Sequence, residues 1–334
     1  MSVGDKVTVR PSSDTRATPL LTSNDLLILS VVFIWGINFS VLTVVLESMT
    51  PLAFNGLRFS LATLVMLLIL AWRGESFRAA RRDIVPIFLL GLVGHTLYQV
   101  FFITGMARTT PANASLLMAT APIFVVIYGA LLGIERVSRR TWAGVLLSFL
   151  GLLLLIGGGG GVSLDPATLL GDLLVLVAAM LWAAYTTGSK PLLARYTPLK
   201  LTTLSMVAGT LPLLVICMPQ LQAQDWSAVS RGAWAGVFYS AIFSVVYAYL
   251  AWYTSVQRVG NARTAVYSNL TPVVAILVAW IALGQALAPI QIAGALVVLS
   301  GVMLTRRGRI VATVRSEAES VRGAEGGKAG DAAV

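Results

Sequence analysis

The sequence of 334 residues is poor in charge. Only 11% of the residues are Asp, Glu, Lys or Arg, whereas 57% are hydrophobic. A soluble domain of ordinary composition contains about 25% charged residues. The chain therefore has too little polar surface to cover a water-soluble globule, and its composition predicts a protein that is surrounded by a lipid bilayer.

Cysteine and acidic residues are also scarce. Cys217 is the only cysteine, which excludes an intrachain disulfide and a cysteine-based metal site. No Asp or Glu lies in the middle of an apolar run, so a carboxylate-based proton or sodium relay has no evident ligands. The sequence contains no HExxH motif, no P-loop and no Ser/His/Asp set at one depth. We therefore expect no metal, no cofactor and no enzymatic activity.

Basic residues exceed acidic ones and give a net charge of +10. They lie at the ends of apolar runs and form no patch interleaved with aromatic residues, which disfavours nucleic acid as a partner. A membrane protein that keeps its Lys and Arg residues on the cytoplasmic side has the same charge balance.

Ten apolar runs lie between two polar ends. Each is close to the ~20 residues that cross ~30 Å of hydrocarbon as a helix, and they are too long and too uniformly apolar for barrel strands. We expect disordered tails at 1–24 and 308–334, the first without the apolar core of a signal peptide. The expected spans are 25–45, 52–72, 84–104, 112–132, 141–157, 171–190, 199–218, 233–254, 263–283 and 289–306.

Positive charge is unevenly divided between the two sides of these spans. With ten spans, both termini and the even-numbered loops share one side, which carries nearly all Lys and Arg residues. The loops of the other side carry only Arg108 and Arg231. This asymmetry predicts that both termini lie in the cytoplasm, and we expect a multi-pass protein of the bacterial cytoplasmic membrane.

The chain also repeats itself. Residues 112–151 align with residues 262–301 without gaps, which places Pro122 on Pro272. An earlier pair matches with a slightly different shift: DLLILSVVFIWG resembles DLLVLVAAMLWA and pairs Trp35 with Trp182. The sequence therefore predicts two five-span halves, 25–160 and 161–307.

Five is an odd number, so the two halves enter the membrane from opposite sides. The charges agree, because the loop after the fourth span is basic (Arg136, Arg139 and Arg140) while the loop after the ninth is uncharged. An inverted repeat is typical of secondary transporters, whose substrate site lies at the repeat interface near the bilayer midplane.

The paired halves, the tryptophan in the first span of each, the APIF and TPVV prolines and the LLGIER loop resemble the drug/metabolite transporter superfamily. The similarity is to its EamA-type ten-helix members in particular. This resemblance implies an all-α integral membrane protein of ten transmembrane helices, with spans five and ten at the periphery and the others around a central cavity. Members include exporters of amino acids, of YddG-like type, and of other small metabolites.

The only histidine lies in the third span. His95, Tyr98, Gln99 and Phe102 have i, i+3, i+4, i+7 spacing and are expected to share one helix face. Polar groups inside spans are costly and usually face the bundle interior. His95 therefore either lines the solute path, with a role in proton coupling or in hydrogen bonding to solute, or anchors a neighbouring helix.

Other polar and aromatic residues have helical spacing in the remaining spans. Each can equally well serve helix packing. The matched prolines Pro122 and Pro272 are expected to kink their helices, either as static bends or as gating elements. The further candidates for substrate binding are Trp35, Asn38, Trp182, Tyr185, Ser244, Tyr247, Tyr267 and Ser268.

Arg58 is the only charged residue well inside a span. It lies about two turns from the end of the second span, where its long side chain is expected to snorkel to the interface. The alternative is a counter-charge for a substrate carboxylate at the outer mouth.

The sequence thus favours a secondary transporter that exports small neutral or zwitterionic metabolites, amino acids first among them, by alternating access. An exporter of lipophilic drugs or nucleotide precursors is a second hypothesis, and an intramembrane lipid-modifying enzyme is a third. The expected partners are a small-molecule substrate and the lipid bilayer, and homo-oligomerisation is left open.

Overall fold

The computed structural model describes residues 22–157, 166–274, 277, 288–307 and 310–312. Within these ranges nine helical segments are long and apolar enough to cross a membrane, and they overlap predicted spans one to eight and ten. Part of the predicted ninth span, 263–283, lies outside the described residues, as does most of both predicted tails.

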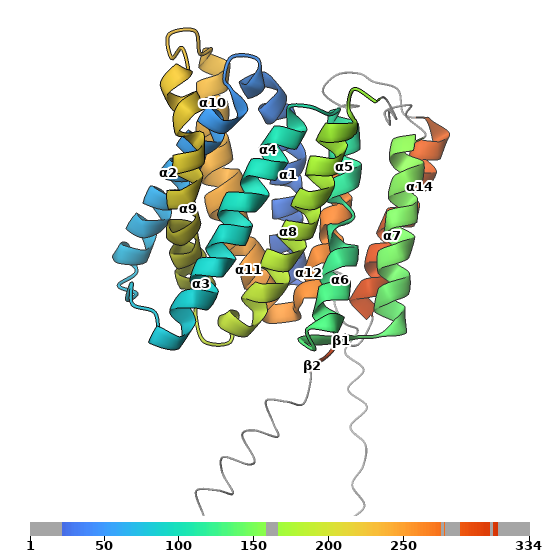
Figure 1. Ribbon diagram of the computed structural model, residues 1–334. Coiled ribbons are helices and arrows are strands. Elements are labelled where there is room, and N and C mark those ends of the chain that lie inside the picture. The colour runs from blue at the N-terminus through green and yellow to red at the C-terminus, as the bar shows by residue number, and fades with distance from the viewer. Residues whose placement is uncertain (1–21, 158–165, 275–276, 278–287, 308–309, 313–334) are drawn as a thin grey trace, which may run out of the picture.

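The elements of the described ranges are helical apart from two short strands (Figure 1). In the first half the elements are α1 (Ser23–Leu46), α2 (Pro51–Trp72), η1 (Arg81–Asp83), α3 (Ile84–Gly91), η2 (Leu92–Leu97), α4 (Tyr98–Met106), α5 (Pro111–Met118), α6 (Ala121–Leu131), β1 (Glu135–Val137) and α7 (Arg139–Gly157). In the second half they are α8 (Leu169–Leu193), α9 (Pro198–Ala223), α10 (Arg231–Tyr239), η3 (Ser240–Tyr247), α11 (Ala248–Val259), α12 (Asn261–Ala265), η4 (Val266–Leu270), α14 (Pro289–Arg307) and β2 (Ile310–Ala312).

Several helices begin at residues that the local sequence marks. Thr22 caps α1, and a reciprocal capping box joins its side chain and backbone to Asp25. Pro51, Pro111 and Pro198 each occupy the first turn of a helix directly after a threonine, where the missing N–H leaves no hydrogen bond unmade. These starts depend on neighbouring residues alone, which is why the sequence locates them well.

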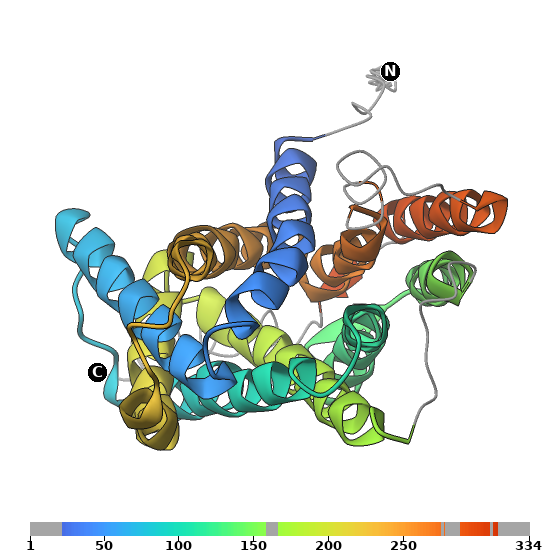
Figure 2. The ribbon, with the colours of Figure 1, turned by 90° about the horizontal axis from the view of Figure 1, so that it is seen from above.

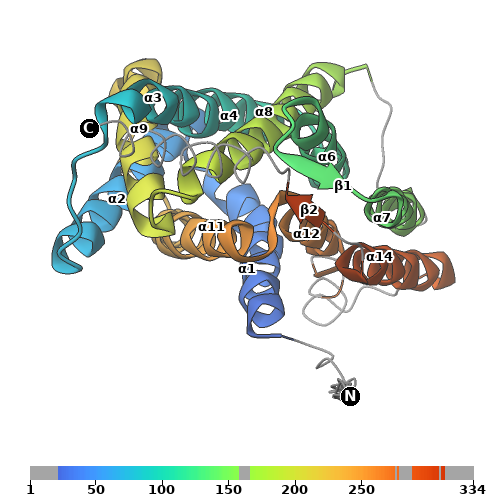
Figure 3. The same ribbon diagram turned by 90° about the horizontal axis from the view of Figure 1, so that it is seen from below.

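The helices α7 and α14 pack side by side at one edge of the bundle (Figures 2 and 3). A Cβ atom added at Gly144 would lie 2.6 Å from the Gly301 carbonyl oxygen, and one added at Gly294 would lie 2.8 Å from the Gly151 oxygen. The sequence repeat equates Gly144 with Gly294 and Gly151 with Gly301. Exchanging the two halves therefore maps one contact onto the other, as an inverted repeat requires.

The strands β1 and β2 place the start of α7 and the end of α14 at one end of the molecule, the lower end in Figure 1. They pair antiparallel, with Arg136 opposite Val311. The sequence assigned Ile310–Ala312 to the C-terminal tail, but these residues form β2. Backbone hydrogen bonds to β1 order them, a long-range pairing that their composition does not reveal.

Four spans are irregular, at matching places in the two halves. The third and eighth spans contain the π-helical segments η2 and η3. The fourth span is interrupted between α5 and α6, immediately before Pro122, and the ninth contains the 3₁₀ segment η4 immediately before Pro272. Proline lacks the N–H that would continue the helix, which accounts for an interruption at each place, whereas the expected kink at each proline stays a prediction. A gating role for either stays a prediction.

Candidate functional site

A cavity of about 90 Å³ lies between the two halves. Both halves contribute to its wall, through α1, α2, α4, α5 and α6 on one side and α8, η3, α11 and η4 on the other. Aromatic and polar side chains share the lining, which includes Trp35, Asn38, Phe39, Arg58, Tyr98, Gln99, Phe102, Ser115, Met118, Trp182, Ser244, Tyr249, Ser268, Thr271 and Pro272. The structure thus brings together seven of the eleven residues that the sequence proposed for substrate binding. Five lie on α1, α4 and α8, and the other two are Ser244 and Ser268.

Arg58 is the cationic residue of this wall. Only 3% of its surface is exposed, so the expectation that it snorkels to the interface is wrong. Its Nη2 atom donates to Asn55 Oδ1 at 2.6 Å and to Gln99 Oε1 at 2.8 Å. The guanidinium also lies over the rings of Phe54 and Phe59, 4.9 and 5.2 Å from their centroids. Because these partners are neutral amides and aromatic rings, they hold the cation without neutralising it.

A hydrogen-bond chain across the two halves fixes the amide of Gln99. Its Nε2 atom donates to the Tyr249 hydroxyl at 3.0 Å, which turns Oε1 toward Arg58. Gln99 and Tyr249 have the same sequence offset as Pro122 and Pro272, so equivalent positions meet here. The sequence-based selection missed Tyr249, although the repeat itself, applied to Gln99, could have found it.

Trp35 and Trp182 are the second pair of equivalent residues that meet. Their rings lie 5.5 Å apart at an interplanar angle of 82°, and the Trp35 Nε1 donates to the Ser244 carbonyl at 3.0 Å. Both rings line the cavity, so they pack against each other and also form part of the cavity wall. Trp182 contacts four further rings, those of Tyr98, Tyr185, Tyr249 and Trp252.

His95 lies behind the cavity wall rather than in it. The side chain is fully buried, with Nε2 at 2.8 Å from the Tyr185 hydroxyl and 3.1 Å from Ser205 Oγ. It belongs to the π-helical segment η2, whereas Tyr98 and Gln99 belong to the α-helix that follows. A π-helical turn holds more residues than an α-helical one and rotates His95 off their shared face. The polar-anchor interpretation fits this position, and a role of His95 or Tyr185 in the solute path stays a prediction.

Replacing His95 with alanine is expected to lower the thermal stability of the detergent-solubilised protein. The substitution removes a hydrogen-bond partner from the hydroxyls of Tyr185 and Ser205 and opens a cavity in the packed interior. Losing a partner of a buried polar group costs roughly 1–3 kcal/mol. The melting midpoint measures this effect, and an unchanged midpoint would contradict the anchoring role.

The candidate residues that the sequence places in spans eight and nine do not all reach the cavity. Ser244 and Ser268 line the cavity. Tyr247 instead is 39% exposed and pairs with Ser30 at 2.7 Å on the outside of the bundle. Tyr267 is buried away from the cavity and donates to Asp25. The segments η3 and η4 depart from 3.6 residues per turn, so spacing alone places these residues on the wrong faces.

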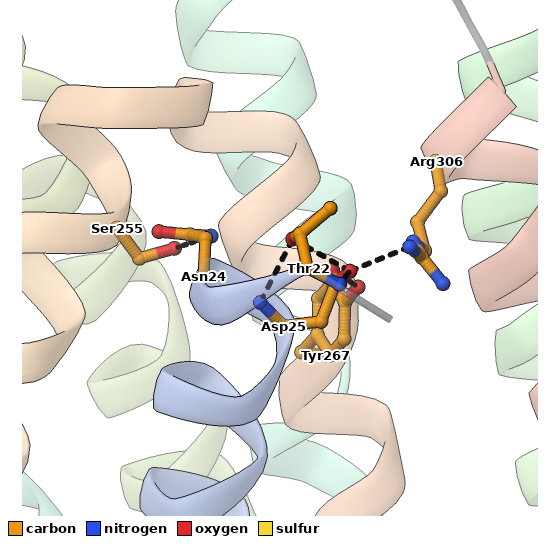
Figure 4. A network of polar contacts seen from close by, with 6 residues as sticks. All are labelled: Thr22, Asn24, Asp25, Ser255, Tyr267 and Arg306. Atoms are coloured by element: carbon orange, nitrogen blue, oxygen red, sulfur yellow. Dashed lines mark hydrogen bonds and ion pairs between the residues drawn. The ribbon is translucent and has the colours of Figure 1, made fainter. Parts of the chain in front are cut away.

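A polar network at the lower end joins α1 to three other elements (Figure 4). Asp25 accepts from the Tyr267 hydroxyl, from Thr22 and from Arg306, whose Nη2 is 2.5 Å away. Beside it, the Asn24 amide donates to Ser255 Oγ at 3.0 Å. These contacts connect the start of α1 with α11, η4 and the last turn of α14.

The profile of the EamA-like transporter family matches the chain twice, over residues 22–157 and 169–307. The chain belongs to the EamA-like transporter family. This membership confirms the prediction that the protein is a transporter and not an enzyme. It also confirms the predicted helical membrane fold built from repeats. The two matched ranges correspond to the two inverted halves seen in the packing of α7 and α14.

Relatives of this EamA-like transporter include an uncharacterized transporter of Archaeoglobus fulgidus, 30% identical over 85% of this chain and 98% of that protein. A probable terminal-alkyne amino-acid exporter of Streptantibioticus cattleyicolor is 32% identical over 69% of this chain and 75% of the relative. A probable amino-acid metabolite efflux pump of Salmonella typhimurium is 28% identical, with 83% and 93% covered. One crystal structure superposes with a TM-score of 0.71 at 22% identity, over 84% of this chain and 96% of the other, which supports the fold alone.

Proposed function

We propose that this transporter exports small zwitterionic metabolites, amino acids first among them, across the bacterial cytoplasmic membrane by alternating access. The observation that carries the proposal is the cavity between the inverted halves, whose wall combines aromatic faces with amides, hydroxyls and one cation. Two of the relatives described above bear names that refer to amino-acid export. The predicted cytoplasmic position of both termini is part of this proposal.

The cavity wall offers groups of the kinds that an amino acid requires. The hydroxyls of Ser244 and Thr271 are buried and have no hydrogen-bond partner among the described residues, so both are free to bind a solute. Trp35 and Trp182 present rings that suit apolar side chains and also attract an ammonium group by cation–π contact. Such neutral groups bind weakly enough to permit release on the far side.

Alternating access requires that the cavity be closed at one end at a time. At the lower end, the Asp25 network joins α1 to η4 and α14, and Lys190 Nζ donates to the Val256 carbonyl at 2.7 Å between α8 and α11. These contacts must break for the cavity to open there. In an inverted repeat, exchanging the conformations of the two halves moves the opening from one side of the membrane to the other.

Replacing Asp25 with alanine is expected to increase access to the cavity from the membrane face at which α1 begins. The substitution removes the acceptor that Tyr267 and Arg306 share. In a Cys217→Ser background, a Ser268→Cys probe is expected to react several-fold faster with a membrane-impermeant maleimide added at that face. Asp225→Ala is the matched control, because Asp225 lies exposed in the α9–α10 loop, where its carboxylate accepts from Ser227 of the same loop. Equal labelling rates in the two variants would contradict the role of the network.

The experiment that tests the function is a counterflow screen in proteoliposomes. Vesicles that contain the purified protein are loaded with one solute of a panel, and the uptake of the same labelled solute is measured. The panel contains amino acids, cationic lipophilic drugs and nucleotide precursors. We expect accumulation of small amino acids above that of protein-free vesicles. Accumulation of drugs or nucleotide precursors alone would reject the proposal.

A further inference from the structure

We propose that Arg58 binds the carboxylate of the transported solute and thereby makes the transporter selective for carboxylates over amines. This inference rests on the proposed function and names the group that the substrate must carry. Within the described part of the chain, no Asp or Glu lines the cavity, and Arg58 forms no ion pair. The cation therefore enters the wall without a counter-ion of its own.

A buried cation without a counter-ion is costly, so its position requires a compensating contact. The two amide oxygens of Asn55 and Gln99 both accept from the same atom, Nη2. Nε is buried without a hydrogen-bond partner among the described residues. The guanidinium thus retains unused donors, and a carboxylate is the group that two of them can bind together.

The arrangement is also fixed before any solute arrives. Phe54 and Phe59 lie against the guanidinium, and Tyr249 orients the amide of Gln99 through its hydroxyl. Asn55 is also held by α4, because its Nδ2 donates to the Gln99 carbonyl at 3.1 Å. A group that is already immobilised loses little entropy on binding, which favours recognition of a small solute.

The charge of Arg58 also decides which solutes are rejected. Beside a largely apolar wall, a like charge is repelled more strongly than it would be in bulk water. An amine without a carboxylate would bring a second positive charge to Arg58. A zwitterionic amino acid brings its carboxylate to Arg58 and leaves its ammonium group for the rings and hydroxyls of the same cavity.

The test compares one amino acid that the counterflow screen identifies with its methyl ester, its decarboxylated amine and its deaminated acid. Each is added as an unlabelled competitor against the labelled amino acid in the wild-type protein. We expect the deaminated acid to compete and the ester and the amine to compete about 10- to 100-fold less well, the size expected for loss of a charge-assisted hydrogen bond. Equal competition by the ester would overturn the inference but leave the proposed function intact.

Two variants then assign the discrimination to this residue. Gln99→Glu places a carboxylate of nearly the same shape 2.8 Å from Arg58 and is expected to occupy it. Amino-acid counterflow should fall at least about tenfold, and the amine should gain as a competitor. Arg58→Lys keeps the charge but loses the planar pair of N–H donors that can bind both oxygens of a carboxylate. We therefore expect weaker binding with the preference for carboxylates retained.

Arg231→Gln is the matched control, because it removes a cation that lies exposed at the start of α10. It should transport like the wild type. Gel filtration and the melting midpoint show whether each variant is folded, and the rise of the midpoint on adding the acid or the amine gives a second readout of binding. Folded Gln99→Glu protein that discriminates amino acid from amine as the wild type does would overturn the inference. Wild-type protein that carries only amines would reject both this inference and the proposed function.

Discussion

Replacing Gly209 with alanine is expected to reduce sharply the amount of folded protein recovered from membranes. The added Cβ atom would lie 2.2 Å from the Gly91 carbonyl oxygen and 2.7 Å from the Cβ of His95. At Gly91 the backbone of the third span therefore touches the backbone of α9, and no flexible side chain is available to move aside. Overpacking of this kind typically costs 1–3 kcal/mol, and more where backbone must shift, as it must here.

Gly129→Ala provides the matched control for this prediction. Gly129 is also buried within a membrane-spanning helix, but an added Cβ would lie 3.8 Å from its nearest neighbour, the Cβ of Glu135. Both substitutions gain the same helix propensity, about 1 kcal/mol, so the difference between them isolates the close approach. Fluorescence-detected gel filtration and the melting midpoint measure it. Equal yields of the two variants would show that the two spans are not in backbone contact at Gly209.

Replacing Trp182 with alanine is expected to reduce transport at least about tenfold in the counterflow assay. Trp182 lines the cavity and contacts five other rings, including its repeat partner Trp35. Truncation of a buried tryptophan to alanine costs about 3–5 kcal/mol and leaves a void into which neighbouring rings can move. Both the shape of the cavity and the contact between the halves are then lost.

The control for this variant is Trp226→Ala. Trp226 lies in the loop between α9 and α10, is 38% exposed and packs against Trp234. Removing it takes away the same side chain without touching the cavity, so transport should remain close to that of the wild type. Trp182→Phe should retain part of the activity, because the smaller ring preserves some contacts. Undiminished transport by Trp182→Ala would contradict a role for this ring in the substrate site.

The cavity shows how far helical spacing can predict a site. Tyr98 and Gln99 were expected on one face and are found on the cavity wall. His95 was expected beside them but lies behind the wall, because η2 changes the number of residues per turn between them. A π-helical segment depends on how the helix packs against its neighbours, and the sequence of Leu92–Leu97 has no pattern that predicts it.

For Arg58, spacing along the helix placed the side chain outside the cavity, whereas the structure places it in the cavity wall. Spacing from the helix end suggested that its side chain reaches the interface, and a counter-charge for a carboxylate was the alternative. Which of the two applies depends on whether the interior contains neutral hydrogen-bond acceptors for the guanidinium. Asn55 is in the same helix and visible from the sequence, but the oxygen of Gln99 comes from the third span, 41 residues away. Only the packing of the two spans could supply it.

The sequence by itself determined the number and limits of most spans, the starts of the helices and the relation between the two halves. These features follow from the local composition of each apolar run, from capping residues such as Thr22 and from alignment of the chain with itself. The tertiary structure alone decided which face of each irregular helix meets the cavity and which polar groups pair across helices, as Gln99 does with Tyr249. Those choices depend on long-range packing, because a buried polar group is satisfied by whichever partner the neighbouring helix brings within reach.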